Sequence, residues 1–327
     1  MKKRARLMLI GSTLTAAMMA LAESARHGAA NYFVGVALNR ELPPHPMGAE
    51  RKLVANCIDE QMLNSLRQVG ERLAAQQHDT VKIQSRDGTH LVGHWMGVAN
   101  PKRVIIAMHG WRSVWHRDFG VIADFFAKND CSVLYTEQRG QGGSGGEYMG
   151  FGLMERHDCL DWINWVNKKT GKKLPVYLCG ISMGASTVLM AAGLDLPDNV
   201  RGIIADCGYT SPLDIWKHVA KQAHISYGIC GRPAGRLAKK RLRMAMDEET
   251  CPQALSRSKT PVLFVHGTDD KFVPIEMTYE NYKACAAPRR LFIVPGAEHG
   301  MSYLTDTPGY ENALQSFWAD FDGNISS

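Results

Sequence analysis

The stretch VYLCGISMGASTVL, residues 176–189, decides the fold. In it an apolar, strand-like run leads into the pattern Gly-x-Ser-x-Gly, formed by Gly180, Ser182 and Gly184, and a helix-like run follows. A serine on a sharp turn between a strand and a helix leaves no room for a Cβ two positions before or after it. The stretch therefore predicts a nucleophile elbow, in which the Ser182 Oγ stands clear of the backbone and the Met183 N–H is free to bind an oxyanion.

Two partner residues are expected further along the chain. A serine hydroxyl at its ordinary pKa is a poor nucleophile, so Ser182 needs a histidine to accept its proton and a carboxylate to orient that histidine. Residues 261–266 are typical of a buried strand, and Asp270 lies in the polar loop that follows. Residues 291–294 are the next strand-like run, followed by His299. Serine, aspartate and histidine, each placed after a predicted strand, indicate a catalytic triad.

From about Thr80 onward the chain resembles the α/β-hydrolases, and among them the serine-aminopeptidase-like branch, which includes bacterial hydrolases with an N-terminal apolar segment. The resemblance rests on these motifs: His109-Gly110-Trp111, Arg139-Gly140-Gln141-Gly142-Gly143-Ser144, Gly180-Ile181-Ser182-Met183-Gly184, the His-Gly-x-x-Asp run from His266 to Asp270, and Glu298-His299-Gly300. It implies an α/β fold with a mostly parallel sheet, helices on both faces and a helical lid insertion at about 210–258. The alternation of helical and strand-like runs from Val81 onward favours the same sheet.

The resemblance also implies roles for individual residues. Asp270 holds the position of the acid in its motif, which leaves Asp269 as an exposed neighbour. Asp206 ends another strand-like run and is an alternative acid, or else a loop or helix-capping residue. The second oxyanion donor is expected to be the N–H of Trp111. His109 in this motif supports the loop rather than acting as the base.

Three further side chains, Trp111, Trp115 and His116, are expected either to line the substrate pocket or to pack against the lid. Together these features predict a serine hydrolase that needs no cofactor and cleaves a small-molecule or lipid-like ester or thioester through an acyl-enzyme. A peptidase or amidase, an acyltransferase or a lyase would use the same triad, and a non-catalytic binding module would use the same fold. These alternatives stay open at the level of sequence.

The N-terminus has the composition of a membrane or export segment. Basic residues lie within 2–6, and an uncharged stretch follows from 7 to 22. This stretch is shorter than the roughly 20 apolar residues of a spanning helix, but it has the charged and apolar regions of an export signal. Residues 20–22 would form a cleavage site, whereas residues 32–38, which are apolar again, would extend an uncleaved anchor.

These features divide the chain into an anchor or signal segment (1–40), a helical lead-in (41–79) and a hydrolase domain (80–327). Residues 1–40 are then expected to be dispensable for catalysis. Positive charge before the apolar stretch favours a cytoplasmic N-terminus and an extracytoplasmic catalytic domain. A cytoplasmic or a secreted enzyme is the alternative.

Composition excludes several other classes of protein. The chain has 327 residues, of which 45% are hydrophobic and 21% charged, and its net charge is +6. A basic cluster at 232–243 has no interleaved aromatics, which argues against nucleic-acid binding. It is either an amphipathic face that contacts anionic head groups or acidic substrates, or a solvated face. The 8 cysteines and 12 histidines show no spacing typical of a disulfide scaffold or a metal site.

Overall fold

The computed structural model of the chain describes residues 23–44, 60–223 and 227–323. The predicted anchor or signal stretch before residue 23 lies outside the described residues. Within them the chain forms one eight-stranded sheet. Its strands are β1 (Asp79–Gln84), β2 (His90–Met96), β3 (Arg103–Met108), β4 (Cys131–Glu137), β5 (Val176–Ile181), β6 (Val200–Asp206), β7 (Val262–Gly267) and β8 (Arg289–Val294).

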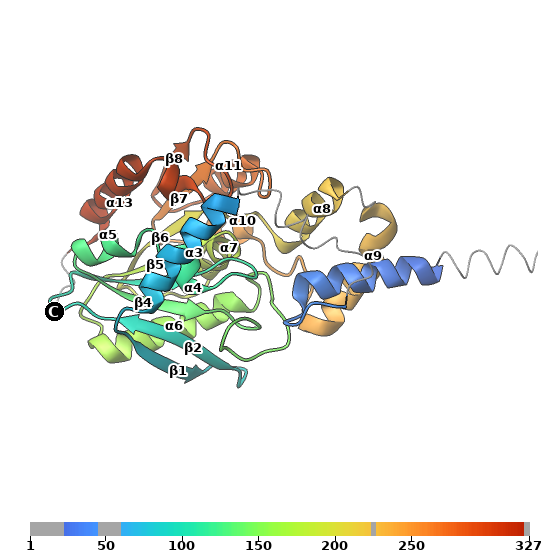
Figure 1. Ribbon diagram of the computed structural model, residues 1–327, viewed down its shortest axis with the longest axis horizontal. Coiled ribbons are helices and arrows are strands. Elements are labelled where there is room, and N and C mark those ends of the chain that lie inside the picture. Colours follow the sequence, from blue (N-terminus) through green and yellow to red (C-terminus); the bar gives the residue numbers. More distant parts are fainter. Residues whose placement is uncertain (1–22, 45–59, 224–226, 324–327) are drawn as a thin grey trace, which may run out of the picture.

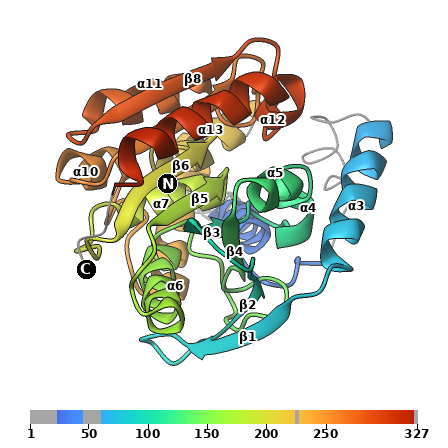
Figure 2. The ribbon, with the colours of Figure 1, turned by 90° about the vertical axis from the view of Figure 1, so that its left-hand side faces the viewer.

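The strand order across the sheet is β1-β2-β4-β3-β5-β6-β7-β8, which Figure 2 shows from β1 at the bottom to β8 at the top. β2 pairs antiparallel with β1 and β4, and every other neighbouring pair is parallel. The prediction of a mostly parallel sheet is confirmed. The carboxyl ends of parallel strands meet at one edge, so the loops after β3, β5, β7 and β8 emerge side by side.

Helices cover both faces of the sheet, as expected (Figures 1 and 2). One core cluster contains residues of the helices α3 (Glu60–Ala74), α4 (Trp115–Phe119), α5 (Ala123–Lys128) and α13 (Thr307–Phe321). The other contains residues of α6 (Glu155–Thr170), α7 (Met183–Ala191), α8 (Pro212–Gln222), α9 (Tyr227–Leu242), α10 (Cys251–Ser256) and α11 (Ile275–Ala284). A short helix, α12 (Ser302–Thr305), precedes α13.

Alternation along β3 shows how the two clusters share the sheet. All six residues of β3 are buried. Ile105 and Ala107 belong to the cluster with α5 and α13, whereas Ile106 and Met108 belong to the cluster with α6 and α7. Because successive side chains of a strand point to opposite faces, a strand covered on both sides must be apolar at every position.

The expected insertion between β6 and β7 is helical and consists of α8, α9 and α10. Ser211 caps α8 by accepting a hydrogen bond from the Asp214 N–H, and Pro212 occupies the first turn. At the other end of α8, the Nε2 of His218 lies 3.2 Å from the carbonyl oxygen of Lys271. The insertion is therefore tied to the loop that follows β7.

Residues 23–38 form an amphipathic helix that packs against the domain, drawn in blue in Figure 1. Ala30, Val34 and Leu38 recur on one face and are at most 1% exposed. The Phe33 ring lies 5.2 Å from that of Trp216 in α8. The interpretation of 32–38 as an extension of a membrane helix is thus corrected, because its apolar face is buried in the core. Among the described residues no helix has the length and apolarity needed to span a membrane.

Candidate active site

Ser182 lies at the turn between β5 and α7 in a strained backbone conformation. Its φ of 57° and ψ of −116° are uncommon for an L-residue. A Cβ at Gly180 would lie 2.2 Å from the Gly184 carbonyl oxygen, and one at Gly184 would lie 1.9 Å from the Met108 carbonyl oxygen. Both contacts are with backbone and cannot relax easily, so only glycine fits the two positions that flank the elbow.

The two predicted partners of Ser182 form a chain of hydrogen bonds with it. The Nε2 of His299 is 2.9 Å from the Oγ of Ser182, and its Nδ1 is 2.7 Å from the Oδ2 of Asp270. The other two candidate acids lie elsewhere. Asp269 is exposed and accepts a hydrogen bond from Thr268, and Asp206 accepts one from the Ser302 hydroxyl. Of the three aspartates, the geometry therefore joins Asp270 to the histidine.

Asp270 is buried and its carboxylate is fully hydrogen-bonded. Its Oδ1 accepts hydrogen bonds from the backbone N–H groups of Phe272 (2.9 Å) and Val273 (2.8 Å). Its Oδ2 also lies 3.1 Å from the Nε2 of His266. Burial alone would raise the pKa of Asp270, but the positive charge that His299 can carry and the hydrogen bonds lower it below its usual range. The carboxylate is therefore ionised and available to orient the imidazole.

The same pairing acts on His299. Burial alone would lower the pKa of His299, but the charge of Asp270 and the hydrogen bond to it raise that pKa above its ordinary value. A base with a raised pKa accepts the serine proton more readily, provided that the imidazole is neutral beforehand.

The two predicted oxyanion donors border the elbow. Met183 is the first residue of α7, and Trp111 lies in the loop after β3. Within the described residues, neither backbone N–H has an acceptor in the protein. A Cβ at Gly110, which precedes Trp111, would lie 3.5 Å from the Cβ of Ser182. The loop that carries Trp111 thus passes directly beside Ser182.

Comparison with known proteins finds a family model of hydrolases and several bacterial relatives. Residues 99–223 match the family model described as serine aminopeptidase, S33. The chain is 29% identical over 190 residues to the Bacillus subtilis protein YqkD, covering 57% of this chain and 61% of that one, so the match spans under two thirds of the relative's length. It is 24% identical over 229 residues to Escherichia coli (strain K12) YfhR, covering 68% of this chain and 73% of that one.

Among solved structures, the chain superimposes on the Pyrococcus furiosus esterase Pf2001 with a TM-score of 0.63 and 19% identity, covering 86% of this chain and 98% of that one. This likeness, with the strand order and the elbow, decides the fold. The chain has the α/β-hydrolase fold.

The loop after β3 is held by polar contacts on both sides. The Nε2 of buried His109 accepts a hydrogen bond from the Gln138 N–H (3.1 Å), and its Nδ1 lies 2.8 Å from the Gly110 carbonyl oxygen. The carboxylate of Asp118 accepts hydrogen bonds from the Gly110 N–H (2.7 Å) and the Ser113 hydroxyl. His109 therefore supports the loop, and Asp118 is a second support that no sequence motif indicated.

The N-terminal helix forms a further support of this loop. The Nε1 of Trp111 donates to the Ala37 carbonyl oxygen at 2.9 Å. The guanidinium of Arg112 donates to the carbonyl oxygens of Val36 (2.8 Å), Asn39 (2.6 Å) and Arg40 (3.2 Å). These carbonyls at the end of a helix lack intrahelical partners, so a cation satisfies them well. Residues 23–40 belong to the folded domain, whereas the sequence placed them in the anchor segment.

Two of the predicted pocket residues, Trp115 and His116, pack against other elements of the fold. The Trp115 side chain is 5% exposed, stacks on His94 at 4.5 Å between ring centroids, and lies 5.2 Å from the Tyr135 ring. His116 faces α3, where a Cβ at Gly70 would lie 3.1 Å from its Nδ1. Both side chains pack between α4, α3 and the sheet rather than against the insertion. Sequence gave no sign of this, because α4 is a single short helix without a clear apolar period.

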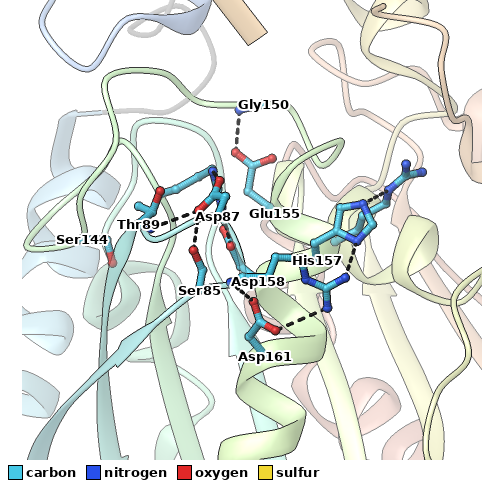
Figure 3. Close-up of polar contacts among 12 residues, drawn as sticks. Ser85, Asp87, Thr89, Ser144, Gly150, Glu155, His157, Asp158 and Asp161 are labelled. Carbon is cyan, nitrogen blue, oxygen red and sulfur yellow. Dashed lines mark hydrogen bonds and ion pairs between the residues drawn. The ribbon is translucent and has the colours of Figure 1, made fainter. Parts of the chain in front are cut away.

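A buried polar network anchors the long loop after β4 that runs from 138 to 154. Arg139 donates to the carboxylates of Asp158 (2.5 and 2.6 Å) and Asp87 (2.7 Å). Figure 3 shows Asp87 accepting hydrogen bonds from Ser85 and Thr89, and Glu155 accepting one from the Gly150 N–H.

This network fixes the position of Phe151, which lies between Gly150 and Gly152 in the same loop. Gly152 N–H also donates to Glu155, at 2.8 Å. The Phe151 ring is 6.2 Å from that of Trp111 and 5.7 Å from that of Trp216. The motif around Arg139 thus packs beside the loop after β3, here called the oxyanion loop because it carries the predicted donor Trp111, rather than against the triad.

One group of residues in the described parts of the chain has the spacing of metal ligands, namely Cys207, Asp270 and His299, whose ligand atoms lie within 4.8 Å of one another. Two of the three already hydrogen-bond each other in the triad. Burial raises the pKa of the Cys207 thiol well above its usual range, which disfavours the thiolate that binds metals. We therefore assign Asp270 and His299 to the triad rather than to a metal site.

Proposed function

We propose that the protein is a serine hydrolase that cleaves a carboxylic ester or thioester through an acyl-enzyme intermediate. The observation that carries the proposal is the continuous chain of hydrogen bonds from Ser182 through His299 to Asp270. A hydroxyl, an imidazole and a buried carboxylate in this order are the groups that acyl transfer requires.

Each residue then has a defined role. Ser182 attacks the carbonyl carbon while His299 accepts its proton, and Asp270 holds the imidazole in the tautomer that accepts at Nε2. The N–H groups of Met183 and Trp111 hold the oxyanion. His299 returns the proton to the leaving group, and water later releases the acyl group by the same steps in reverse order.

Two observations favour an ester or thioester over an amide. The solved relative Pf2001 is named an esterase, and the motifs of this chain include no recognised anchor for a peptide amine. The matching family model is described as a serine aminopeptidase, so an amide is the substrate class to compare.

A panel of acyl substrates tests the proposal. Full-length protein and its Ser182→Ala variant would be assayed on p-nitrophenyl esters of graded chain length, on matched thioesters and on matched anilides. We expect ester and thioester turnover that the variant loses. Faster turnover of the anilides would instead indicate a peptidase or amidase, and turnover that persists in Ser182→Ala would contradict the mechanism.

We also propose that the residues before 23 attach the protein to a membrane and that the catalytic domain is extracytoplasmic. The support is the basic stretch 2–6 followed by the uncharged stretch 7–22. A lipid-like acyl substrate would be accessible to an enzyme held at that surface.

A further inference from the structure

A cavity of about 530 Å³ lies within the insertion between β6 and β7, apart from the triad. Its walls come from α8, from α9 and from residues 245–247 that follow α9. Neither Ser182 nor His299 lines it. The cavity is thus a separate feature of the insertion that the proposed hydrolysis does not use.

The wall formed by α9 is strongly cationic. Arg232, Arg236 and Lys239 line the cavity, and their spacing of four and three residues places them on one face of the helix. Within the described residues these three side chains form no ion pair and no hydrogen bond. Like charges on one helix face repel each other, so an anion bound between them would relieve an unfavourable interaction.

The opposite wall adds one more cation and little negative charge. Lys217 of α8 lines the cavity, and its Nζ lies 3.6 Å from Asp214 on its own helix. Asp247 is the one acidic residue among the described lining residues. The lining therefore holds four cationic side chains, one of them paired with Asp214, against the single carboxylate of Asp247, which favours an anionic occupant.

The rest of the lining is apolar. Leu213 of α8, Tyr227 of α9 and the buried side chain of Met246 contribute to the walls. Gly235 leaves the space on the α9 side open, since a Cβ there would meet no atom within 4 Å. A small inorganic ion would leave this apolar surface uncovered, whereas an alkyl chain would cover it.

We propose that this cavity binds an amphiphile in which a phosphate group is joined to an apolar chain. A phosphate carries between one and two negative charges and offers several oxygens, which suits two guanidinium groups and an ammonium group better than a single carboxylate does. The apolar chain lies against Leu213 and Met246. This inference concerns binding alone and does not depend on the proposed hydrolysis.

Calorimetric titration of the full-length protein with inorganic phosphate, octyl phosphate and octyl glucoside tests the proposal. We expect octyl phosphate to bind at least about 10-fold more tightly than either of the others, because only it supplies both the charge and the chain. Equal affinity for inorganic phosphate would contradict the amphiphile, and equal affinity for octyl glucoside would contradict the role of the cations.

Matched variants locate the site. The double substitution Arg232→Gln and Arg236→Gln should weaken octyl phosphate binding by about 10-fold or more. Lys240→Gln, on the same helix but outside the lining, should leave it unchanged. Gly235→Leu should abolish binding by filling the cavity, whereas Gly28→Leu makes the same change at an open helix position elsewhere. Thermal melting confirms folding, and wild-type affinity in the folded double variant or in Gly235→Leu would overturn the site.

Discussion

At the scale of single residues, Ser182 combines a strained backbone with a hydroxyl that lies within hydrogen-bonding distance of His299. Its positive φ turns the side chain away from α7 and toward His299, and Gly180 and Gly184 make that turn sterically possible. The Ser182 N–H donates to the Asp206 carbonyl oxygen at 2.9 Å, which fixes the strained residue to the neighbouring strand. The surrounding backbone therefore holds a conformation that the residue would not adopt by itself.

Substitution of each of the three candidate acids tests which aspartate orients His299. Asp270→Asn should lower turnover by roughly 10³- to 10⁴-fold, because the amide stabilises the wrong imidazole tautomer. Asp269→Asn should change little, since this carboxylate is exposed and bonds to Thr268. Asp206→Asn should affect stability more than turnover because its partner is Ser302. Steady-state kinetics with a folding control would measure this, and a larger loss of turnover at either of the other two would refute the assignment.

The pKa of His299 predicts a pH profile. Its imidazole must be neutral to accept the serine proton, and its pKa is raised above the ordinary value of 6.5, so activity should fall as the pH drops through a value above 6.5. In Asp270→Asn the burial of His299 lowers its pKa without the opposing charge of Asp270. The fall in activity should therefore move to lower pH. Rates of fluorophosphonate labelling against pH would show this, with Asp269→Asn as the control. If the fall in labelling rate occurs at the same pH in Asp270→Asn as in the wild type, Asp270 does not raise the pKa of His299.

Residue-level prediction from sequence depends on how local the signal is. Ser182, Asp270 and His299 could be chosen because each lies in a short motif just after a strand. Asp118 and Arg112 could not, because their partners are set by loop geometry and by a helix more than 70 positions away. Those contacts have no period or motif in the sequence.

At the scale of secondary-structure elements, the helix at 23–38 differs most from expectation. An apolar run that enters a membrane and one that packs on a protein core look alike in sequence. The buried face of Ala30, Val34 and Leu38 distinguishes them only once its partners are known. The parallel strands were easier to predict, because runs buried on both faces are apolar throughout, although the order in which they pair was not evident.

Truncation tests the part played by this helix. Removal of residues 1–22 should leave a stable, active domain. Removal of residues 1–40 should lower the free energy of unfolding by at least about 3 kcal/mol. The buried contacts of Val34 and Leu38 are lost, and the apolar surface of the domain on which they pack becomes exposed. It should also lower turnover, because Trp111 and Arg112 lose their acceptors.

Thermal melting and ester turnover of the two truncated proteins provide the measurement. Equal melting temperatures and equal turnover would show that residues 23–40 do not support the oxyanion loop. A shorter protein that melts lower but retains full turnover would separate packing from positioning and would contradict only the second.

At the scale of the whole molecule, the sheet divides the core into two clusters, and the loops at one edge carry the triad. The insertion and the N-terminal helix lie together beside that edge (Figure 1), and Arg241 of α9 donates hydrogen bonds to Asn39 (2.8 Å) and Asn31 (2.9 Å). The N-terminal helix therefore contacts both the insertion and the oxyanion loop.

Membrane attachment is a prediction about the whole protein. If residues 7–22 are an uncleaved anchor, the full-length protein should sediment with membranes, resist extraction by high salt and keep Met1 in mass spectrometry. Salt screens attachment through exposed cations such as Arg236, but it does not weaken apolar insertion, so the two modes separate in one wash. A soluble full-length protein, or a mature form that begins near Glu23, would show that no anchor is present.

The most direct test of the central claim is covalent labelling of the nucleophile. The protein would be treated with a fluorophosphonate, and the adduct would be located by peptide mass spectrometry. The account predicts one adduct, on Ser182, which disappears in Ser182→Ala and remains in Ser256→Ala, a change at an exposed serine. An unlabelled folded protein, or an adduct that persists in Ser182→Ala, would contradict the assignment of Ser182 as the nucleophile.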